Sequence, residues 1–284
     1  MTVLEVIHKS ADFLARKEVE SPRLQAELLL AHQLGLPRMN LYLNFERALS
    51  PVEVSAVREL VRRRGRREPF QHIVGSASFC GLELCVNRHV LVPRPETELL
   101  AEAAWQFLST LNSQPSTALD FGTGSGCIAI ALAVKCPAAQ VVATDVSPEA
   151  ISVAETNATR HGVQDRVRFV HGDGLDSLPG EARFDLIISN PPYIPSAEIG
   201  TLQPEVRDFD PRAALDGGVD GLAFFRQLAS GSPARLRPGG RVMVEFGDGQ
   251  AGAVRQIFEA QKWIVEAVRE DYSRRQRILV ARRA

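Results

Sequence analysis

The sequence has 284 residues, of which 45% are hydrophobic and 24% are charged. This length predicts about two domains, and the composition is that of an ordinary globular protein rather than a disordered, collagen-like or disulfide-rich chain. Lysine and arginine number 33 against 34 aspartate and glutamate residues, giving a net charge of −1 and no overall field that attracts nucleic acid. We find no signal peptide and no apolar run near the ~20 residues of a membrane span, and therefore expect a soluble cytoplasmic protein.

The cysteines and histidines do not form a metal-binding pattern. The four cysteines, Cys80, Cys85, Cys127 and Cys136, contain no C-x-x-C pair, and no histidines occur at H-x-x-x-H spacing. Structural zinc sites are built from such close pairs. The sequence therefore predicts no metal site, and it predicts free thiols in a reducing compartment.

The N-terminal part of the chain predicts helices only. The segments Thr2 to Glu5 and Ser50 to Glu53 both follow the capping-box pattern ahead of apolar residues. Between them, Ser21-Pro22 begins a second helix over residues 24–34, which ends at Gly35. We therefore expect a small helical bundle with its own core over residues 1–75.

An arginine-rich run covers residues 58–67, with six arginines in ten residues. One interpretation is a contact with phosphate or RNA. The other is a solvated helix end whose positive charges complement the helix dipole. The near-neutral charge of the chain favours the second interpretation.

Residues 76–92 alternate between apolar and polar side chains on both sides of a turn, which predicts a β-hairpin connector. Residues 96–111 are helical in pattern, and strands and helices alternate beyond them. This alternation is typical of a parallel sheet covered on both faces, with binding sites beyond the carboxyl ends of the strands. The predicted strands are residues 117–121, 141–144, 167–170, 186–189 and 242–246.

A glycine-rich turn follows the first of these strands. Glycine lets the backbone turn without a Cβ clash and approach a ligand closely, and Asp145 ends the next strand, where a carboxylate can bind both hydroxyls of a ribose. The spacing G-x-G-x-G, with Cys127 at the sixth position, differs from the dinucleotide pattern G-x-G-x-x-G. The turn resembles motif I of class I methyltransferases, and the alternative is an ordinary tight turn. The candidate residues for binding S-adenosylmethionine are Gly122, Thr123, Gly124, Ser125, Gly126 and Asp145.

Asp173 ends the third predicted strand, where this fold often places a carboxylate near the adenine amino group. An ordinary surface turn is the alternative interpretation. The next residue is Gly174, whereas relatives commonly carry a large apolar side chain there. Any stacking on adenine must therefore come from another part of the chain.

The segment Asn190-Pro191-Pro192-Tyr193 follows the apolar run of residues 184–189. A polar residue and two prolines cannot extend strand pairing, so the turn itself is the feature of interest. The segment resembles the [N/D/S]-P-P-[Y/F/W] motif of methyltransferases that modify a planar nitrogen. The Asn190 side-chain oxygen and the Pro191 carbonyl would accept the two N–H groups of that nitrogen, and Tyr193 would stack on the planar group. Asn190 is also a candidate contact of the cofactor.

Motifs along nearly the whole chain resemble the bacterial peptide-chain release factor glutamine-N5 methyltransferase family. They are residues 69–75, 79–82, 91–98, 120–126, 190–193, 209–218 and 244–247. The resemblance implies a class I methyltransferase fold over residues 93–284, with a Rossmann-like, mostly parallel seven-stranded sheet. It also implies that S-adenosylmethionine is the methyl donor and that residues 1–75 recognise the release factor.

The implied substrate is the side-chain amide of the glutamine in the Gly-Gly-Gln loop of class 1 release factors. Arg94 and Glu98 lie in a segment expected to line the entrance to the site, with Arg94 as a substrate contact; a helix start with acidic residues is the alternative. Glu245 is considered as a residue that contacts the site from a strand end. We expect no membrane and no direct nucleic acid partner.

Other functions share parts of this pattern. A glutamine methyltransferase acting on a large-subunit ribosomal protein is close, and the intact P-R-P-E-T-E run favours release factors over it. An N6-adenine methyltransferase of DNA or RNA should carry a basic groove. A non-catalytic adaptor should show a degraded glycine turn or N-P-P-Y segment, and a nicotinamide oxidoreductase should not have Cys127 in the turn.

Overall fold

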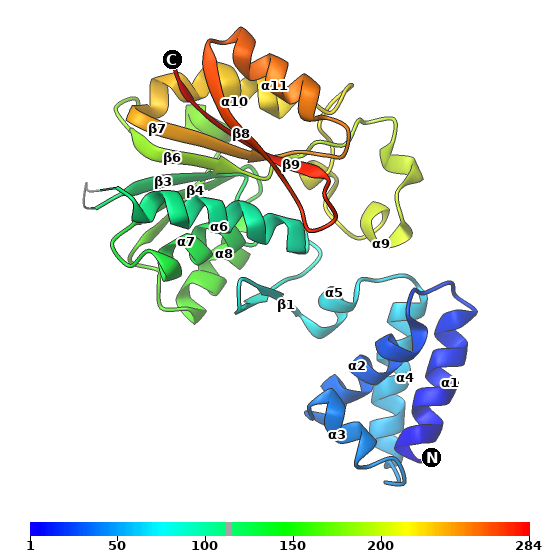
Figure 1. The fold of residues 1–284 in the computed structure, drawn as a ribbon. Coiled ribbons are helices and arrows are strands. Elements are labelled where there is room, and N and C mark those ends of the chain that lie inside the picture. The colour runs from blue at the N-terminus through cyan, green and yellow to red at the C-terminus, as the bar shows by residue number, and fades with distance from the viewer. Residues whose placement is uncertain (112–114) are drawn as a thin grey trace. The chain divides into compact units, whose positions relative to one another are not determined.

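The computed structural model describes residues 1–111 and 115–284, and these form two compact units (Figure 1). The first unit is Met1–Ser76 together with Gln203–Phe209, and the second is Ala77–Leu202 with Asp210–Ala284. The first unit therefore includes a short segment from the middle of the later sequence. Nothing in the residue pattern of Gln203–Phe209 indicated this.

The first unit consists of helices. The helix starts predicted at Thr2 and Ser50 are confirmed, because both side chains accept the N3 backbone N–H and both capping boxes are complete. The second helix begins at Pro22, but Ser21 does not cap it, since this serine has φ 49° and no capping hydrogen bond. The helices are α1 (Val3–Ala15), α2 (Pro22–Leu34), α3 (Arg38–Tyr42), α4 (Pro51–Gly65), α5 (Phe70–Val74) and α9 (Pro204–Arg207).

The core of this unit lies between α1, α2 and α4. Ile7, Leu14, Leu29 and Leu30 are fully buried in it, and each such side chain contributes about 1.5–3 kcal/mol. Gly65 allows α1 and α4 to approach closely, because a Cβ at this position would collide with the ring of Phe13. The buried apolar side chains of this unit thus form a core of their own.

The arginine-rich run is largely neutralised within the same unit. Arg63 forms an ion pair with Glu68 (2.5 Å), and Arg64 and Arg67 both donate to Glu205 on α9, at 2.9 and 2.6 Å. Arg64 also donates from Nε to Gln25 Oε1 (3.0 Å). Arg62 also lies 3.9 Å from Glu59. These contacts support the helix-end interpretation of the run, because four of its six arginines have carboxylate partners in the fold.

The second unit begins with a hairpin, β1 (Ser76–Phe79) and β2 (Leu82–Cys85), and continues with a seven-stranded sheet. The strand order is β5-β4-β3-β6-β7-β9-β8. The strands are β3 (Thr117–Phe121), β4 (Gln140–Asp145), β5 (Val167–His171), β6 (Phe184–Ser189), β7 (Leu236–Glu245), β8 (Trp263–Glu270) and β9 (Gln276–Arg283). All pairs from β5 to β7 are parallel, whereas β9 pairs with β7 and β8 antiparallel. The predicted fold class, a mostly parallel seven-stranded sheet, is confirmed.

Helices cover both faces of this sheet, with α6, α7 and α8 on one side and α10 and α11 on the other (Figure 1). Adjacent residues of β3 therefore point into different cores, Ala118 toward the first set and Leu119 toward the second. All six residues of β6 are buried, as expected for a central parallel strand. The helices are α6 (Pro95–Ser109), α7 (Cys127–Lys135), α8 (Pro148–Arg160), α10 (Ala223–Gly231) and α11 (Ala251–Ala260).

The strand register brings the predicted site segments to one edge. Phe121 pairs with Thr144, and Ser189 pairs with Val244, so β3, β4, β6 and β7 end close together. The residues that follow these ends form a common rim, as the topology of open α/β sheets requires.

Candidate active site

A cavity of about 340 Å³ lies at this edge of the sheet. Its walls come from the turns after β3, β4, β5 and β6, from the segment after the hairpin, and from α10. The lining residues that were predicted as site residues are Gly122, Gly124, Asp145, Asp173, Asn190 and Pro192. One cavity therefore joins the candidate cofactor turn to the N-P-P-Y segment.

The glycine turn divides its residues between the cavity and the interior. Gly122 and Gly124 have φ of 74° and 55° and face the cavity, so their conformation and position both favour glycine. Gly126 has a packing role, because a Cβ there would lie 3.0 Å from the Cβ of Ala154 on α8. Thr123 and Ser125 are buried, and neither belongs to the cavity wall described here.

Asp120 fastens the turn to the helix that follows it. Its Oδ2 accepts hydrogen bonds from Thr123 Oγ1 (2.7 Å) and from the Ala129 N–H (3.1 Å). Burial raises the pKa of Asp120 to about 7, although these two hydrogen bonds lower it. The buried carboxyl holds the backbone of the turn in place beneath the cavity.

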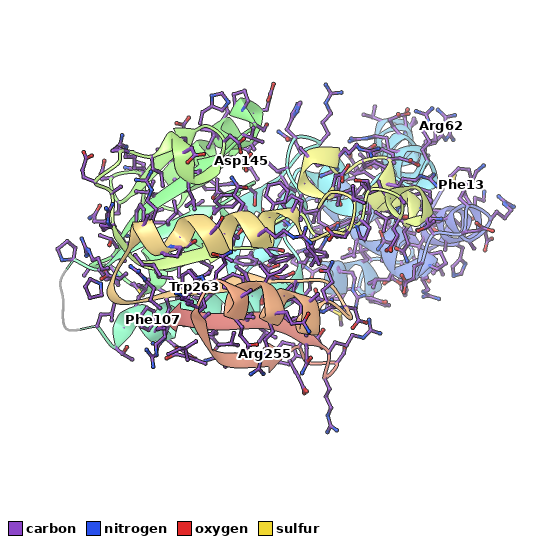
Figure 2. The ribbon with its side chains drawn as sticks, turned by 90° about the horizontal axis from the view of Figure 1, so that it is seen from above. Phe13, Arg62, Phe107, Asp145, Arg255 and Trp263 are labelled. Carbon is purple, nitrogen blue, oxygen red and sulfur yellow. The ribbon has the colours of Figure 1, made fainter. Side chains whose placement is uncertain are left out.

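Asp145 lies at the end of β4 on the cavity wall (Figure 2). Its Oδ2 accepts the Gly124 N–H at 2.8 Å and its Oδ1 accepts the Ser147 N–H at 3.0 Å. A carboxylate has about four lone-pair sites, so two remain available after these bonds. They suit a vicinal pair of hydroxyls, such as those of a ribose.

Two phenylalanines give the cavity an aromatic wall that the sequence analysis missed. Phe121 from β3 and Phe224 from α10 contact edge to face, with ring centroids 6.4 Å apart, and both line the cavity. Gly174 has φ 60°, and a Cβ there would lie 2.7 Å from the Phe121 ring. The Phe121 ring therefore occupies the space that a side chain at residue 174 would need. Phe121 directly precedes the glycine turn and was visible in the sequence, whereas nothing in the sequence marked Phe224.

Asn190 lines the cavity, and its side-chain nitrogen points away from it toward α6. Nδ2 donates to Thr97 Oγ1 at 2.9 Å. Pro192 also lines the cavity, whereas Pro191 is buried. The amide nitrogen of Asn190 is thus already engaged by the protein.

Tyr193 is partly buried and packs against the core on the α10 and α11 side, so its stacking on a substrate stays a prediction. Its ring lies so near Gly247 that a Cβ there would be 3.0 Å from Tyr193 Cδ2. The Tyr193 carbonyl accepts Gln250 Nε2 at 2.9 Å, and burial raises the pKa of its hydroxyl to about 12. The cavity wall described here does not include it.

Arg94 and Glu98 both have partners within the protein. Arg94 forms an ion pair with Asp210 at 2.7 Å, and burial raises the pKa of Asp210 to about 6 although Arg94 lowers it. Glu98 accepts the Cys80 N–H at 2.7 Å and so connects α6 to the hairpin. Neither residue belongs to the described cavity wall, so a substrate contact by Arg94 remains a prediction.

Within residues 1–111 and 115–284, no group of histidine, cysteine, aspartate and glutamate side chains is arranged to hold a metal ion. Over the same residues, every helix is too short or too polar to cross a membrane.

Comparisons with known proteins show the family of this chain. Residues 5–75 match the model of the PrmC N-terminal domain, and residues 99–202 match the methyltransferase small domain. The release factor glutamine methyltransferase of Geobacter sulfurreducens is 50% identical over 259 residues, which are 90% of this chain and 88% of the relative. The protein of the same name from Chlorobaculum tepidum is 45% identical over 96% of this chain and 94% of its own length.

The solved structures show the same fold at lower identity. A methyltransferase from Pyrococcus furiosus has a TM-score of 0.53 and 21% identity, covering 78% of this chain and 97% of that protein. With a cavity that joins the glycine turn to Asn190, and with close relatives over nearly its full length, the chain belongs to the family of release factor glutamine methyltransferases.

Proposed function

We propose that this protein transfers a methyl group from S-adenosylmethionine to the side-chain amide nitrogen of the glutamine in the Gly-Gly-Gln loop of class 1 release factors. The observation that carries the proposal is the single cavity with Asp145 on one wall and Asn190 on another. Because release factors act on the ribosome, we also place the protein in the cytoplasm.

The residues of the cavity fit S-adenosylmethionine. Asp145 has free lone pairs for the ribose hydroxyls, and the Phe121 and Phe224 rings provide apolar surface for the adenine. Asp173 lies on the same wall, where its carboxylate would accept the adenine amino group. When bound, this donor supplies a methyl group that is activated by the positive sulfur.

Asn190 and Pro191 would activate the acceptor nitrogen. An amide nitrogen is a poor nucleophile because its lone pair is delocalised, and it carries two N–H donors. Acceptance of these donors by Asn190 Oδ1 and the Pro191 carbonyl would increase the electron density on nitrogen and fix its plane. Proline assists because it has no N–H that competes for an acceptor.

Correct placement accounts for much of the rate in such a reaction. Methyl transfer requires the nitrogen, carbon and sulfur to be collinear, and orientation alone lowers a barrier by about 7–11 kcal/mol. No general base has to contact the nitrogen before attack, because the proton leaves once the nitrogen has become positive. The histidine and the carboxylates of the described cavity wall, His89, Asp145, Asp173 and Asp216, all come from segments other than the N-P-P-Y turn.

The decisive experiment offers labelled S-adenosylmethionine and a mixture of release factor, ribosomal protein, DNA and RNA to the protein. We expect label on the release factor glutamine, located by mass spectrometry. Asn190→Ala should lower the rate about 100-fold to 1,000-fold, the usual effect of removing one electrostatic contact to a transition state, with little change in cofactor affinity. Asn40→Ala, at an exposed position of the first unit, is the control. Label on another species, or a variant with a near-normal rate, contradicts the proposal.

We further propose that the helical bundle of residues 1–75 recognises the body of the release factor. A groove of about 330 Å³ lies between α1 and α4, with Val6, Phe13 and Val57 in its wall and Lys9, Arg58 and Arg62 along it. Figure 2 shows Phe13 and Arg62 on these helices. An apolar groove with cations along it suits an amphipathic, acidic surface of the substrate protein.

Comparing the intact release factor with a short peptide as substrates separates recognition by the bundle from catalysis. Arg58→Glu with Arg62→Glu should raise KM for the intact release factor about 10-fold or more, and leave KM for a short Gly-Gly-Gln peptide unchanged. Arg255→Glu, an exposed charge on α11, is the matched control. Equal KM changes for protein and peptide would contradict recognition by the bundle.

A further inference from the structure

Asn190 is useful in this reaction only if its oxygen, and not its nitrogen, faces the substrate amide. The side-chain amide has an acceptor at one side and two donors at the other. A flipped amide would present N–H groups to the N–H groups of the glutamine, and both the acceptor and the favourable charge would be lost. Something in the protein must therefore select one of the two orientations.

The neighbours of Asn190 lie on two elements far apart in the sequence. Thr97 is in the first turn of α6 and is 2% exposed, and Glu245 is the last residue of β7 and is also 2% exposed. Asn190 Nδ2 donates to Thr97 Oγ1 at 2.9 Å. Asn190 and Glu245 directly follow Ser189 and Val244, which pair across β6 and β7, and this register brings the Glu245 carboxylate within hydrogen-bonding reach of the Asn190 and Thr97 side chains. The three side chains form a closed network behind the cavity wall.

The direction of the hydrogen bonds in this network follows from Glu245. An ionised carboxylate only accepts, so the single hydroxyl proton of Thr97 is donated to Glu245. Thr97 Oγ1 is then an acceptor, which requires a donor from Asn190. Both protons on Asn190 Nδ2 are thereby directed into the network, and Oδ1 is left for the cavity.

We infer that Glu245, acting directly and through Thr97, is a positioning residue that holds the Asn190 amide with its oxygen toward the substrate nitrogen. The inference rests on the proposed function and adds two residues to it. Glu245 itself does not belong to the described cavity wall, so it orients Asn190 without touching the substrate.

The ionisation of Glu245 supports this role. The pKa of Glu245 is raised to about 7, chiefly by burial and also by the charge of Glu96, although the hydrogen bonds from Thr97 and Asn190 and the charge of Arg277 lower it. The charge of Glu245 in turn raises the pKa of the Tyr193 hydroxyl. Oε2 of Glu245 is buried without a hydrogen-bond partner. Protonation would remove the negative charge of Glu245, add an O–H donor and weaken its acceptance from Thr97 and Asn190, so turnover should decrease as the pH falls below about 7.

Glu245→Gln is the main test, because glutamine keeps the shape and can donate to Thr97. We expect kcat to fall at least 10-fold, with the cofactor Kd and the substrate KM changed less than threefold. The decrease of wild-type kcat below pH 7 should disappear in this variant. Asp120 and Asp210 also have raised pKa values, but both are unchanged in the variant and would not explain that loss. Glu259→Gln, on the exposed face of α11, is the control and should behave as wild type.

The Thr97 variants test the same network independently. Thr97→Val removes the hydroxyl and should match Glu245→Gln, whereas Thr97→Ser keeps it and should restore at least a third of the wild-type kcat. The double variant Glu245→Gln with Thr97→Val should be no slower than either single one, since both break one network. If Glu245→Gln does not fold, as shown by the absence of a melting transition, the kcat values of Thr97→Val and Thr97→Ser test the network instead.

The outcomes separate this inference from the proposed function. If the wild type methylates the release factor glutamine while Glu245→Gln and Thr97→Val keep kcat within threefold, the inference is wrong and the function stands. The inference is also wrong if the variants lose cofactor affinity in proportion to kcat, because a collapsed site would explain that result. If the wild type methylates no glutamine, the proposed function fails and the inference fails with it.

Discussion

Replacing Asp145 with alanine tests how the cavity binds its cofactor. The carboxylate accepts Gly124 N–H and Ser147 N–H, and its remaining lone pairs are available for two ribose hydroxyls. Each hydrogen bond to a charged group contributes about 1.5–3 kcal/mol, so the loss of two costs about 3–6 kcal/mol. Because each 1.4 kcal/mol is a factor of about ten, Kd for S-adenosylmethionine should rise about 100-fold to 10,000-fold.

Isothermal titration calorimetry measures this Kd directly, and a melting curve checks that the variant is folded. Asp165→Ala, an exposed carboxylate on the loop before β5, is the matched control and should bind as wild type. Asp145→Asn should give an intermediate loss, since its amide keeps one acceptor. A Kd for Asp145→Ala within threefold of wild type would show that the ribose lies elsewhere and refute the reasoning.

Two further predictions concern the aromatic wall and the first unit. Phe224→Ala should raise the cofactor Kd about 5-fold to 150-fold, because stacking on a base contributes about 1–3 kcal/mol; binding at the wild-type Kd in calorimetry would remove Phe224 from the adenine site. Glu205→Gln should lower the free energy of unfolding by about 1.5–3 kcal/mol in urea, since it weakens hydrogen bonds to two arginines. Asp208→Asn, in an exposed ion pair, is the control and should leave the free energy of unfolding nearly unchanged. Burial acts to raise the pKa of Glu205, but hydrogen bonds from Arg67 and Arg64 lower it overall; its stabilisation is therefore complete above its ordinary value of 4.5 and is lost as the pH falls below it. Acid titration of the melting temperature should show a shallower fall in Glu205→Gln, and parallel curves would contradict this assignment.

Local signals explain what could be predicted from the sequence. The capping boxes at Thr2 and Ser50 depend on residues three apart, and the glycine turn and the N-P-P-Y segment depend on consecutive residues. Backbone constraints of glycine and proline act wherever these residues stand. The period of apolar residues likewise identified the five inner strands and the covering helices.

The two C-terminal strands, β8 and β9, could not be predicted from the local residue pattern. β8 and β9 complete the sheet in antiparallel register, but their residue pattern did not single them out. β9 has four buried residues in its centre and two exposed arginines at its C-terminal end, and β8 has mixed burial. β9 is stabilised by pairing with β7, and β8 by pairing with β9, rather than by a strong pattern of their own.

The sequence by itself determined the class of fold, the position of the cofactor turn and the chemistry expected at Asn190, because each follows from residues close together in the chain. Only the tertiary structure decided which distant residues complete the site. It placed Phe224 beside Phe121, packed Tyr193 against the core, and brought Thr97 and Glu245 to Asn190. These contacts join residues far apart in the chain, and strand register and helix packing, which no local pattern encodes, set them.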